Sequence, residues 1–480
     1  MSTCFPVRIS LIFLIFMFSS LFLYAEPIST DALINAVKDG SLETVKELVS
    51  KGASPSAFNS KGISPLHTAA YFGQAQIMEY LCAKTTEINI QDNKGWTPLM
   101  WTAYKGHEGT AAALLAKNAR VDIQAIQKQT ALMLAARNGY AGIAELFVRH
   151  KADIHIQDDE GWTALTYAAA FSHLDVVSFL VEKGADPKKT DNAGNCLLSL
   201  AFSSEDIDPR VIEYLIKKGS QVNHKNYDGW TPLMHAIYTN QKQGAEILIA
   251  NKALLNEKNN KGMTALLIAC ESNNTQAAVF LVARGADFTI RSADGWDALL
   301  YAASMGSEDL VAALLIKKAS INTAAADGFT PLMAAAAAGH PVIVKKLIAA
   351  GANLEQKTTS AKTPLMFGSW GLDAEVITAL LDAGAQVNEK DADGMTALHL
   401  VCDREYDLPT IRQPDDEKSA ELAKNYIDGI LRGWEADALK AVEILVSYKA
   451  DITLQNNKGE TPLDLAKKKD RKQVAALLSR

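Results

Sequence analysis

The chain has 480 residues and a formal net charge of -7, with 48% hydrophobic and 21% charged residues. This composition is typical of a chain that buries a core, which excludes a disordered or fibrous protein. Acidic and basic residues are mixed along the chain, so it lacks the dense positive charge that phosphate contacts require, and we expect no nucleic-acid partner.

The first 25 residues differ from the rest. Arg8 is the only charged residue there, an apolar run extends from Ile9 to Tyr24, and Ala25 precedes a polar segment. This layout predicts a secretory signal peptide, residues 1–25, cleaved after Ala25. The alternative is an uncleaved membrane anchor, although the run is shorter than the roughly 20 residues that span a bilayer. A lipoprotein is not expected, because no Cys stands at the end of the run and Cys4 lies before it.

Residues 26–480 are predicted to form a single domain of repeats. A Thr followed by Pro or Ala and then Leu recurs, with variations, at a position that we call the cap slot. The cap slots are Ser64, Thr97, Thr130, Thr163, Cys196, Thr231, Thr264, Asp297, Thr330, Thr363, Thr396 and Thr461. They are 33 residues apart, except for gaps of 35 after Cys196 and 65 after Thr396. Such a fixed period predicts an array of stacked units.

Each unit is expected to contain two short helices. A Ser, Thr or Asp at the slot can cap a helix, and a following Pro is tolerated in the first helical turn. The first helix ends at a Gly, as at Gly106 or Gly339, and a second apolar-periodic segment such as that from Pro341 ends at another. A polar stretch with Asp and Gly then predicts a hairpin-like turn. One such helix pair buries its apolar face only against neighbouring pairs.

In these motifs the chain resembles the ankyrin-repeat family. The segments that carry the resemblance are KGISPLHTAA, GWTPLM, DGMTALHLV, YKGH, AAGH, EKGADP and ARGAD. The resemblance covers residues 31–480 and implies an all-α repeat fold, a solenoid of about 13 helix-turn-helix units with hairpin-like turns. The chain departs from the family pattern where Met replaces the family's His, which puts hydrogen bonding near the slot in doubt. Those positions are Met100, Met133, Met234, Met333 and Met366.

The two ends and one insertion depart from the regular repeat. Residues 31–60 are predicted as an N-terminal capping unit, 61–458 as internal repeats, and 459–480 as a C-terminal capping unit. The long gap after Thr396 predicts an insertion at about 405–437, between the two helices of one unit. Within it, apolar residues at helical spacing predict an extra amphipathic helix, which either covers the array or forms a contact site. They are Leu422, Ala423, Tyr426, Ile427, Ile430, Leu431 and Trp434.

The sequence offers little for catalysis or metal binding. Five of the nine histidines, His67, His399, His107, His173 and His340, stand at positions where the family has a structural His. The other four (His150, His155, His224 and His235) have no Cys or carboxylate at ligand spacing. The four cysteines after the apolar run lie in non-adjacent units, too far apart for disulfides, so we expect buried free thiols. We predict no enzyme activity, no cofactor and no metal.

Ankyrin-repeat proteins usually bind partners on the concave side, and the resemblance places the exposed positions four, three and one before each slot and seven and eight after it. Twelve of the sixty such positions are aromatic, against 7% for the chain. Exposed Trp and Tyr often anchor protein interfaces, although these rings could instead pack hairpin on hairpin. The predicted partner-binding residues, which besides aromatics include Met263 in a stripe from Trp230 to Phe329, are Trp96, Tyr104, Trp162, Phe171, Tyr227, Trp230, Tyr238, Met263, Trp296, Phe329 and Trp370.

We therefore predict a non-catalytic, monomeric scaffold that binds a protein partner outside the cytoplasm, periplasmic or secreted, with no membrane contact unless the signal is uncleaved. The resemblance further suggests a bacterial protein, because its simple N-terminal signal is typical of exported bacterial members. One alternative is an exported effector or immunity protein that engages a foreign protein. Another is an enzyme with a site in the insertion, against which stands the absence of catalytic motifs there.

Overall fold

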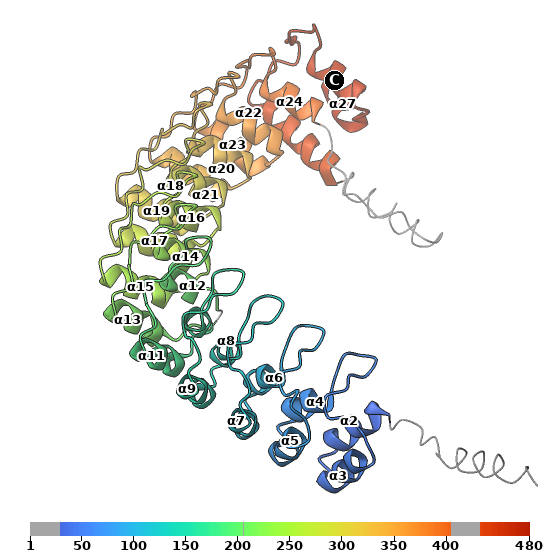
Figure 1. Cartoon of the computed structure of the whole chain (residues 1–480). Helices are drawn as coiled ribbons and strands as arrows, with labels where there is room; N and C mark the ends of the chain where they lie inside the picture. Colours follow the sequence, from blue (N-terminus) through green and yellow to red (C-terminus); the bar gives the residue numbers. More distant parts are fainter. Residues whose placement is uncertain (1–28, 205, 405–432) are drawn as a thin grey trace, which may run out of the picture. The chain divides into compact units, whose positions relative to one another are not determined.

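The computed structural model describes residues 29–204, 206–404 and 433–480 of the chain (Figure 1). The predicted signal peptide, residues 1–25, and most of the predicted insertion lie outside these residues. The chain divides into two compact units, Met1–Gln221 and Val222–Arg480. Apart from one isolated bridge between Thr190 and Cys196, the described residues form helices, turns and loops, so the predicted all-α repeat fold is confirmed.

The first unit is a series of helix pairs. A first and a second helix alternate along the chain, and hairpin-like connections project to one side of the helices (Figure 1). The helices are α2 (Thr30–Lys38), α3 (Leu42–Ser50), α4 (Pro65–Phe72), α5 (Ala75–Cys82), α6 (Pro98–Lys105), α7 (Glu108–Ala116), α8 (Ala131–Arg137), α9 (Ala141–Arg149), α10 (Ala164–Ala170), α11 (Leu174–Glu182), α12 (Leu197–Ala201) and α13 (Pro209–Lys217).

The second unit continues the same alternation. Its helices are α14 (Pro232–Tyr238), α15 (Lys242–Ala250), α16 (Ala265–Glu271), α17 (Thr275–Ala283), α18 (Ala298–Ser304), α19 (Glu308–Ile316), α20 (Pro331–Ala337), α21 (Pro341–Ala349), α22 (Pro364–Gly371), α23 (Ala374–Asp382), α24 (Ala397–Asp403), a helix at 433–447, α26 (Pro462–Lys468) and α27 (Lys472–Leu478). The described residues thus contain the helix pair of each predicted repeat.

The start of α6 shows how the cap slot works. The Thr97 side chain accepts a hydrogen bond from the backbone N–H of Met100 at 3.3 Å, and Pro98 occupies the first helical turn. The Met100 sulfur in turn accepts from the backbone N–H of Thr97 at 3.4 Å. A methionine at the position of the family's His therefore still satisfies one free amide at the start of the helix.

Where the position holds a His, the side chain also reaches the next repeat. His67 Nδ1 lies 2.8 Å from Ser64 Oγ, and its Nε2 donates to the backbone carbonyl of Trp96 at 3.0 Å. The ring is buried, and burial lowers the pKa of His67. A neutral ring with one donor and one acceptor thus connects two successive repeats.

Helices pack on their counterparts in the neighbouring repeats. In the first unit α4 packs on α6 and α6 on α8, while α5 packs on α7; in the second unit α18 packs on α20 and α20 on α22. The buried residues between them are mostly Leu, Ala, Val, Ile and Met. Each short helix pair therefore completes its core with residues from its neighbours.

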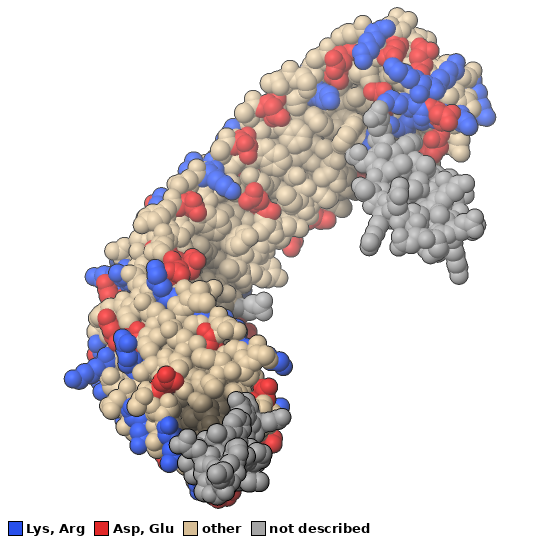
Figure 2. Space-filling model, turned by 45° about the vertical axis from the view of Figure 1, so that its right-hand side comes forward, with Lys and Arg blue, Asp and Glu red and all other residues tan. Residues whose placement is uncertain are grey.

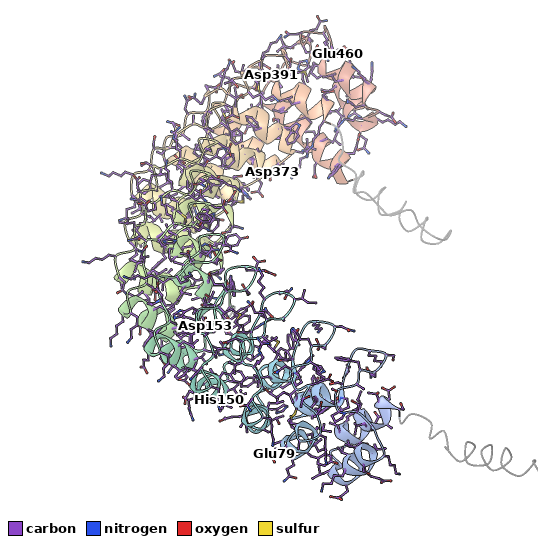
Figure 3. All side chains as sticks on the ribbon, in the orientation of Figure 1. Glu79, His150, Asp153, Asp373, Asp391 and Glu460 are labelled. Atoms are coloured by element: carbon purple, nitrogen blue, oxygen red, sulfur yellow. The ribbon has the colours of Figure 1, made fainter. Side chains whose placement is uncertain are left out.

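The hairpin-like turns are linked from one repeat to the next by side chains eight residues before the slots. Asn89 Oδ1 accepts from the backbone N–H of Arg120 at 2.9 Å, and Asp122 accepts from that of Asp153 at 3.1 Å. Asp153 is labelled in Figure 3. In the second unit, Asn223 accepts from Leu254 at 2.8 Å in the same way. These bonds satisfy amides that a turn would otherwise leave unpaired.

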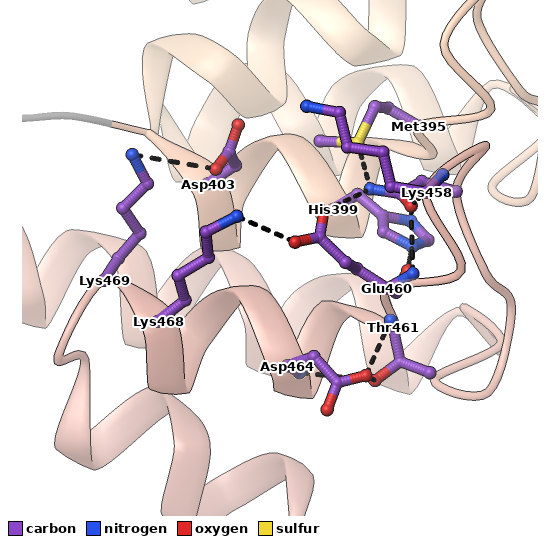
Figure 4. Close-up of polar contacts among 10 residues, drawn as sticks. Met395, His399, Asp403, Lys458, Glu460, Thr461, Asp464, Lys468 and Lys469 are labelled. Carbon is purple, nitrogen blue, oxygen red and sulfur yellow. Dashed lines mark hydrogen bonds and ion pairs between the residues drawn. The ribbon is translucent and has the colours of Figure 1, made fainter.

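The last repeat stacks directly on the unit that contains the insertion. α24 packs on α26, and His399 Nε2 donates to the backbone carbonyl of Glu460 at 3.2 Å (Figure 4). The Glu460 carboxylate also accepts from Lys468 Nζ at 2.8 Å, and Thr461 and Asp464 form a capping box. The helices on either side of the inserted segment, α24 and α26, thus pack on each other as the first helices of successive repeats do elsewhere.

Residues 433–437, the last of the predicted insertion, are the part of it that the structure describes. Residues 433–437 belong to a helix that runs without interruption from 433 to 447, with Ala438, Ala441, Val442 and Leu445 buried. The end of the insertion therefore extends the second helix of the repeat at its N-terminus. Trp434 lies half-buried in this helix, whereas the other residues of the predicted amphipathic helix lie outside the described residues.

Candidate functional site

The hairpin face, by which we mean the hairpin-like turns and first helices of the repeats, carries most of the predicted binding residues. Four tryptophans directly precede cap slots on this face, and each is half-buried. Each packs against a ring five residues later, at the fourth position of the following helix. The pairs and their ring-centroid distances are Trp96–Trp101 at 4.7 Å, Trp162–Tyr167 at 5.1 Å, Trp230–His235 at 5.2 Å and Trp296–Tyr301 at 5.1 Å.

Hairpin carboxylates hold two of these partner rings in place. Trp101 Nε1 donates to Asp92 at 2.9 Å, and the Tyr167 hydroxyl donates to Asp158 at 2.7 Å. Burial raises the pKa of Tyr167, and the hydrogen bond to Asp158 raises it further. Each carboxylate also accepts from backbone amides of its own turn, as Asp158 does from Trp162 at 2.8 Å. The tryptophans therefore belong to the repeat structure as well as to its surface.

Five of the predicted residues are well exposed. Tyr227 exposes 75% of its surface, Tyr238 63% and Trp370 50%, and Tyr104 and Phe171 are also exposed. In the second unit, Trp296 stacks on Phe329 with ring centroids 6.0 Å apart, which is the hairpin-on-hairpin packing considered as an alternative. The predicted residues thus include both exposed rings and rings that pack from one hairpin onto the next.

The prediction that Met263 is exposed was wrong. Met263 exposes only 6% of its surface, and the Tyr301 hydroxyl of the next repeat donates to its sulfur at 4.0 Å. An unbranched thioether folds into the space under a neighbouring ring more readily than an indole does. The predicted stripe from Trp230 to Phe329 is therefore interrupted at Met263.

A cavity of about 840 Å³ in the second unit has Met263 among its lining residues. Trp230, Tyr238 and Tyr301 contribute aromatic walls, while Asp228, Glu271 and Asp294 contribute carboxylates. The sequence-based prediction did not include Tyr301, which lies outside the five exposed positions of each repeat. It did not include the acidic residues either, because it was confined to aromatic and other apolar side chains. A signal was present, since Trp101, Tyr167, His235 and Tyr301 stand at the fourth helical position of alternate repeats.

A second cavity, of about 540 Å³, lies at the N-terminal end of the first unit. Its walls include Ile63, Tyr71, Phe72 and Trp101. Lys105 Nζ lies 4.3 Å from the centre of the Tyr71 ring, so an ammonium group already occupies one aromatic face there.

The model of the family described as ankyrin repeats (3 copies) matches residues 33–125, 114–191, 198–292, 251–325, 281–358, 299–391 and 332–411. The chain belongs to the ankyrin-repeat family.

One similar protein is the human ankyrin repeat and SOCS box protein 2, which is 40% identical over 63 residues. That match covers 13% of this chain and 10% of the relative, so the chain spans about a tenth of the relative's length. Ankyrin repeats are generally modules for binding other proteins, and this array has the architecture of such a module.

The remaining histidines of the ankyrin motif are structural. His107, His173 and His340 each donate through Nε2 to a backbone carbonyl of the preceding repeat, at 2.9 to 3.1 Å. The His173 ring covers Gly139, where an added Cβ would lie 2.6 Å from Nδ1. Gly139 also has a φ of +74°, which disfavours any side chain. The Gly-His motif thus joins two repeats.

The cysteines of the described array are free and buried, as predicted. Burial raises the pKa of Cys82 to about 11 and that of Cys402 to about 12. Thiols with such pKa values carry almost no thiolate near neutral pH and are therefore poor nucleophiles.

The described part of the chain contains no group of three or more His, Cys, Asp or Glu side chains that could hold a metal ion. None of its helices has both the length and the apolar character needed to cross a membrane.

Proposed function

We propose that this ankyrin-repeat chain is an exported, non-catalytic scaffold that binds a protein partner through its hairpin face. The observation that carries the proposal is the exposure of Tyr227 and Tyr238 beside the 840 Å³ cavity. Large exposed rings next to a concave surface are typical anchors of protein interfaces.

The charge distribution supports a protein partner rather than a polyanion. Basic and acidic side chains are interspersed over the face shown in Figure 2, with broad areas of other residues between them. Nucleic-acid binding would require a continuous basic tract. A mixed surface with aromatic anchors suits a folded protein.

The proposed face can be tested by site-specific photocrosslinking. A photoreactive phenylalanine analogue at position 238 should crosslink the partner in cells that produce the chain. The same analogue at position 316 is the matched control, because Ile316, at the end of the second helix α19, exposes 79% of its surface. Crosslinks from position 316 but none from position 238 would place the interface elsewhere.

A pair of variants completes the test. Tyr238→Ala should reduce capture of the crosslinked partner by the purified chain at least fivefold, since hot-spot aromatics contribute about 1 kcal/mol or more. Ile316→Ala should leave that capture unchanged. Equal capture by the two variants would refute the hairpin face as the binding site.

Export rests on the pattern of residues 1–25 and needs its own measurement. Intact mass analysis of the chain recovered from outside the cytoplasm of a bacterial host should give a protein that begins at Glu26. Recovery of the chain only in the cytoplasm would contradict the proposal, and an intact N-terminus in the membrane fraction would favour the uncleaved anchor.

A further inference from the structure

The cavity in the second unit extends over three consecutive repeats. Its walls come from the turns before α14, α16 and α18 and from the helices themselves. Asp228 and Asp294 stand at the same position of two turns, three residues before their slots, and Glu271 ends α16. A volume of about 840 Å³ lies within the range of about 300–1,000 Å³ typical of ligand-binding clefts.

The cavity has an excess of negative charge. Lys261 is its one Lys or Arg side chain, set against the carboxylates of Asp228, Glu271 and Asp294. All three carboxylates belong to exposed residues, and within the described chain no ion pair to a Lys or Arg involves any of them. Some carboxylates elsewhere on the turns are paired, as Glu257 is with Lys225 at 2.6 Å and Glu389 with Lys357 at 2.7 Å.

The carboxylates of Glu271 and Asp294 both influence the hydroxyl group of Tyr301 electrostatically. Burial raises the pKa of Tyr301, and the nearby charges of Glu271 and Asp294 add to that rise. Residues from two different repeats therefore direct negative potential at one aromatic wall of the cavity. A cation placed there would gain Coulomb energy from both carboxylates.

Aromatic faces stand beside this negative charge. The rings of Trp230 and Tyr238 are 5.5 Å apart and nearly perpendicular, with an angle of 88° between their planes. Tyr238 is largely exposed, and Tyr301 adds a further ring that is itself packed on Trp296. A perpendicular pair of rings offers one face for stacking and one edge that limits how the guest is oriented.

We propose that this cavity binds the side chain of an arginine carried by a basic segment of the protein partner. The inference rests on the proposed function and adds the chemistry of the partner. A guanidinium group is planar, stacks on Trp and Tyr, and donates in several directions to carboxylates. A lysine ammonium would use the charge of the cavity but less of its flat aromatic surface.

The test is a binding measurement with defined peptides. The probe is a fluorescein-labelled dodecapeptide of Gly and Ser with three arginines, and its control has citrulline, which is neutral and nearly the same shape, at the same positions. Fluorescence polarisation with the purified full chain should show at least tenfold tighter binding of the arginine peptide. Raising the salt concentration should reduce that difference, because exposed charges are screened.

Charge variants locate the site. Glu271→Gln should weaken binding of the arginine peptide about two- to fivefold, the range expected for one exposed charge pair. Lys261→Gln should strengthen it, because it removes the competing ammonium. The citrulline peptide should respond to neither change. Asp309→Asn is the matched control, since Asp309 is an exposed carboxylate at the start of α19, away from the cavity lining.

Several results would overturn the inference. Equal affinity for the arginine and citrulline peptides would exclude a preference for the cation, and an unchanged affinity in Glu271→Gln would place the binding site elsewhere. Agmatine, a small guanidinium compound, binding as tightly as the arginine peptide would show a small-molecule site. If any of these occurs while Tyr238→Ala still loses the crosslinked partner, the scaffold function stands and only the arginine assignment fails.

Discussion

Replacing Gly139 by Ala should destabilise the array through the contact between two repeats. Gly139 follows α8 with a φ of +74°, and the His173 ring of the next repeat lies over it. His173 Nε2 donates to the Arg137 carbonyl at 2.9 Å, so the ring is held in that position. A methyl group at position 139 and the ring as placed cannot both be accommodated.

The expected cost has two parts. A non-glycine residue in the left-handed region costs about 1–2 kcal/mol. The added Cβ would lie 2.6 Å from His173 Nδ1, closer than carbon and nitrogen can approach, so the ring must move and its hydrogen bond is lost. Such a bond contributes about 0.5–1.5 kcal/mol. Together these effects predict a loss of about 1.5–3.5 kcal/mol in the free energy of unfolding.

Urea denaturation followed by circular dichroism would measure the loss, and amide hydrogen exchange would locate it in α8 to α11. Gly459→Ala is the matched control, because Gly459 has a similar φ of +78° and nothing within 4 Å of an added Cβ. It should cost about 1 kcal/mol less than Gly139→Ala. Equal losses for the two variants would refute the steric role assigned to His173.

Three further predictions concern the aromatic face, a histidine and the thiols. Trp296→Ala should lower the free energy of unfolding by about 2–3 kcal/mol, because it removes a half-buried indole and its contacts with the rings of Tyr301 and Phe329. Tyr238→Ala should lower it by less than about 1 kcal/mol, because that ring is largely exposed. Urea denaturation would measure both values. Because burial lowers the pKa of His67, its contribution to stability is fully present above its ordinary value of 6.5 and is lost as the pH falls below it; His67→Met should therefore show a smaller loss of stability between neutral and mildly acidic pH. The four buried cysteines should stay unmodified by iodoacetamide at pH 8 in the native chain and react after denaturation, as intact mass would show.

Local signals in the sequence were sufficient for the fold. The Thr97-Pro98 start and the Gly106 end of α6 each have a local physical cause, and the structure shows both as predicted. The regular period then determines which helices are neighbours, so long-range packing followed from local pattern. Local signals did not show that residues 433–437, the last of the predicted insertion, continue into the second helix of the repeat as one uninterrupted helix.

The candidate site was only partly predictable. Exposure of Tyr227 and Tyr238 followed from their position in the repeat, but the half-burial of Trp230 depends on His235 five residues later. Burial of Met263 depends on a ring of the next repeat. Such contacts arise from side-chain packing between repeats, which a position-by-position reading does not include.

The bond from His399 to Glu460 joins residues 61 positions apart, and α24 packs on α26 as other neighbouring first helices do. At this point, residues far apart in the sequence are therefore joined by direct contact in space. Such a junction is suited to the insertion of a foreign domain. A foreign domain spliced between α24 and the helix at 433–447, with its termini close together, should fold there while the flanking repeats keep their melting temperature.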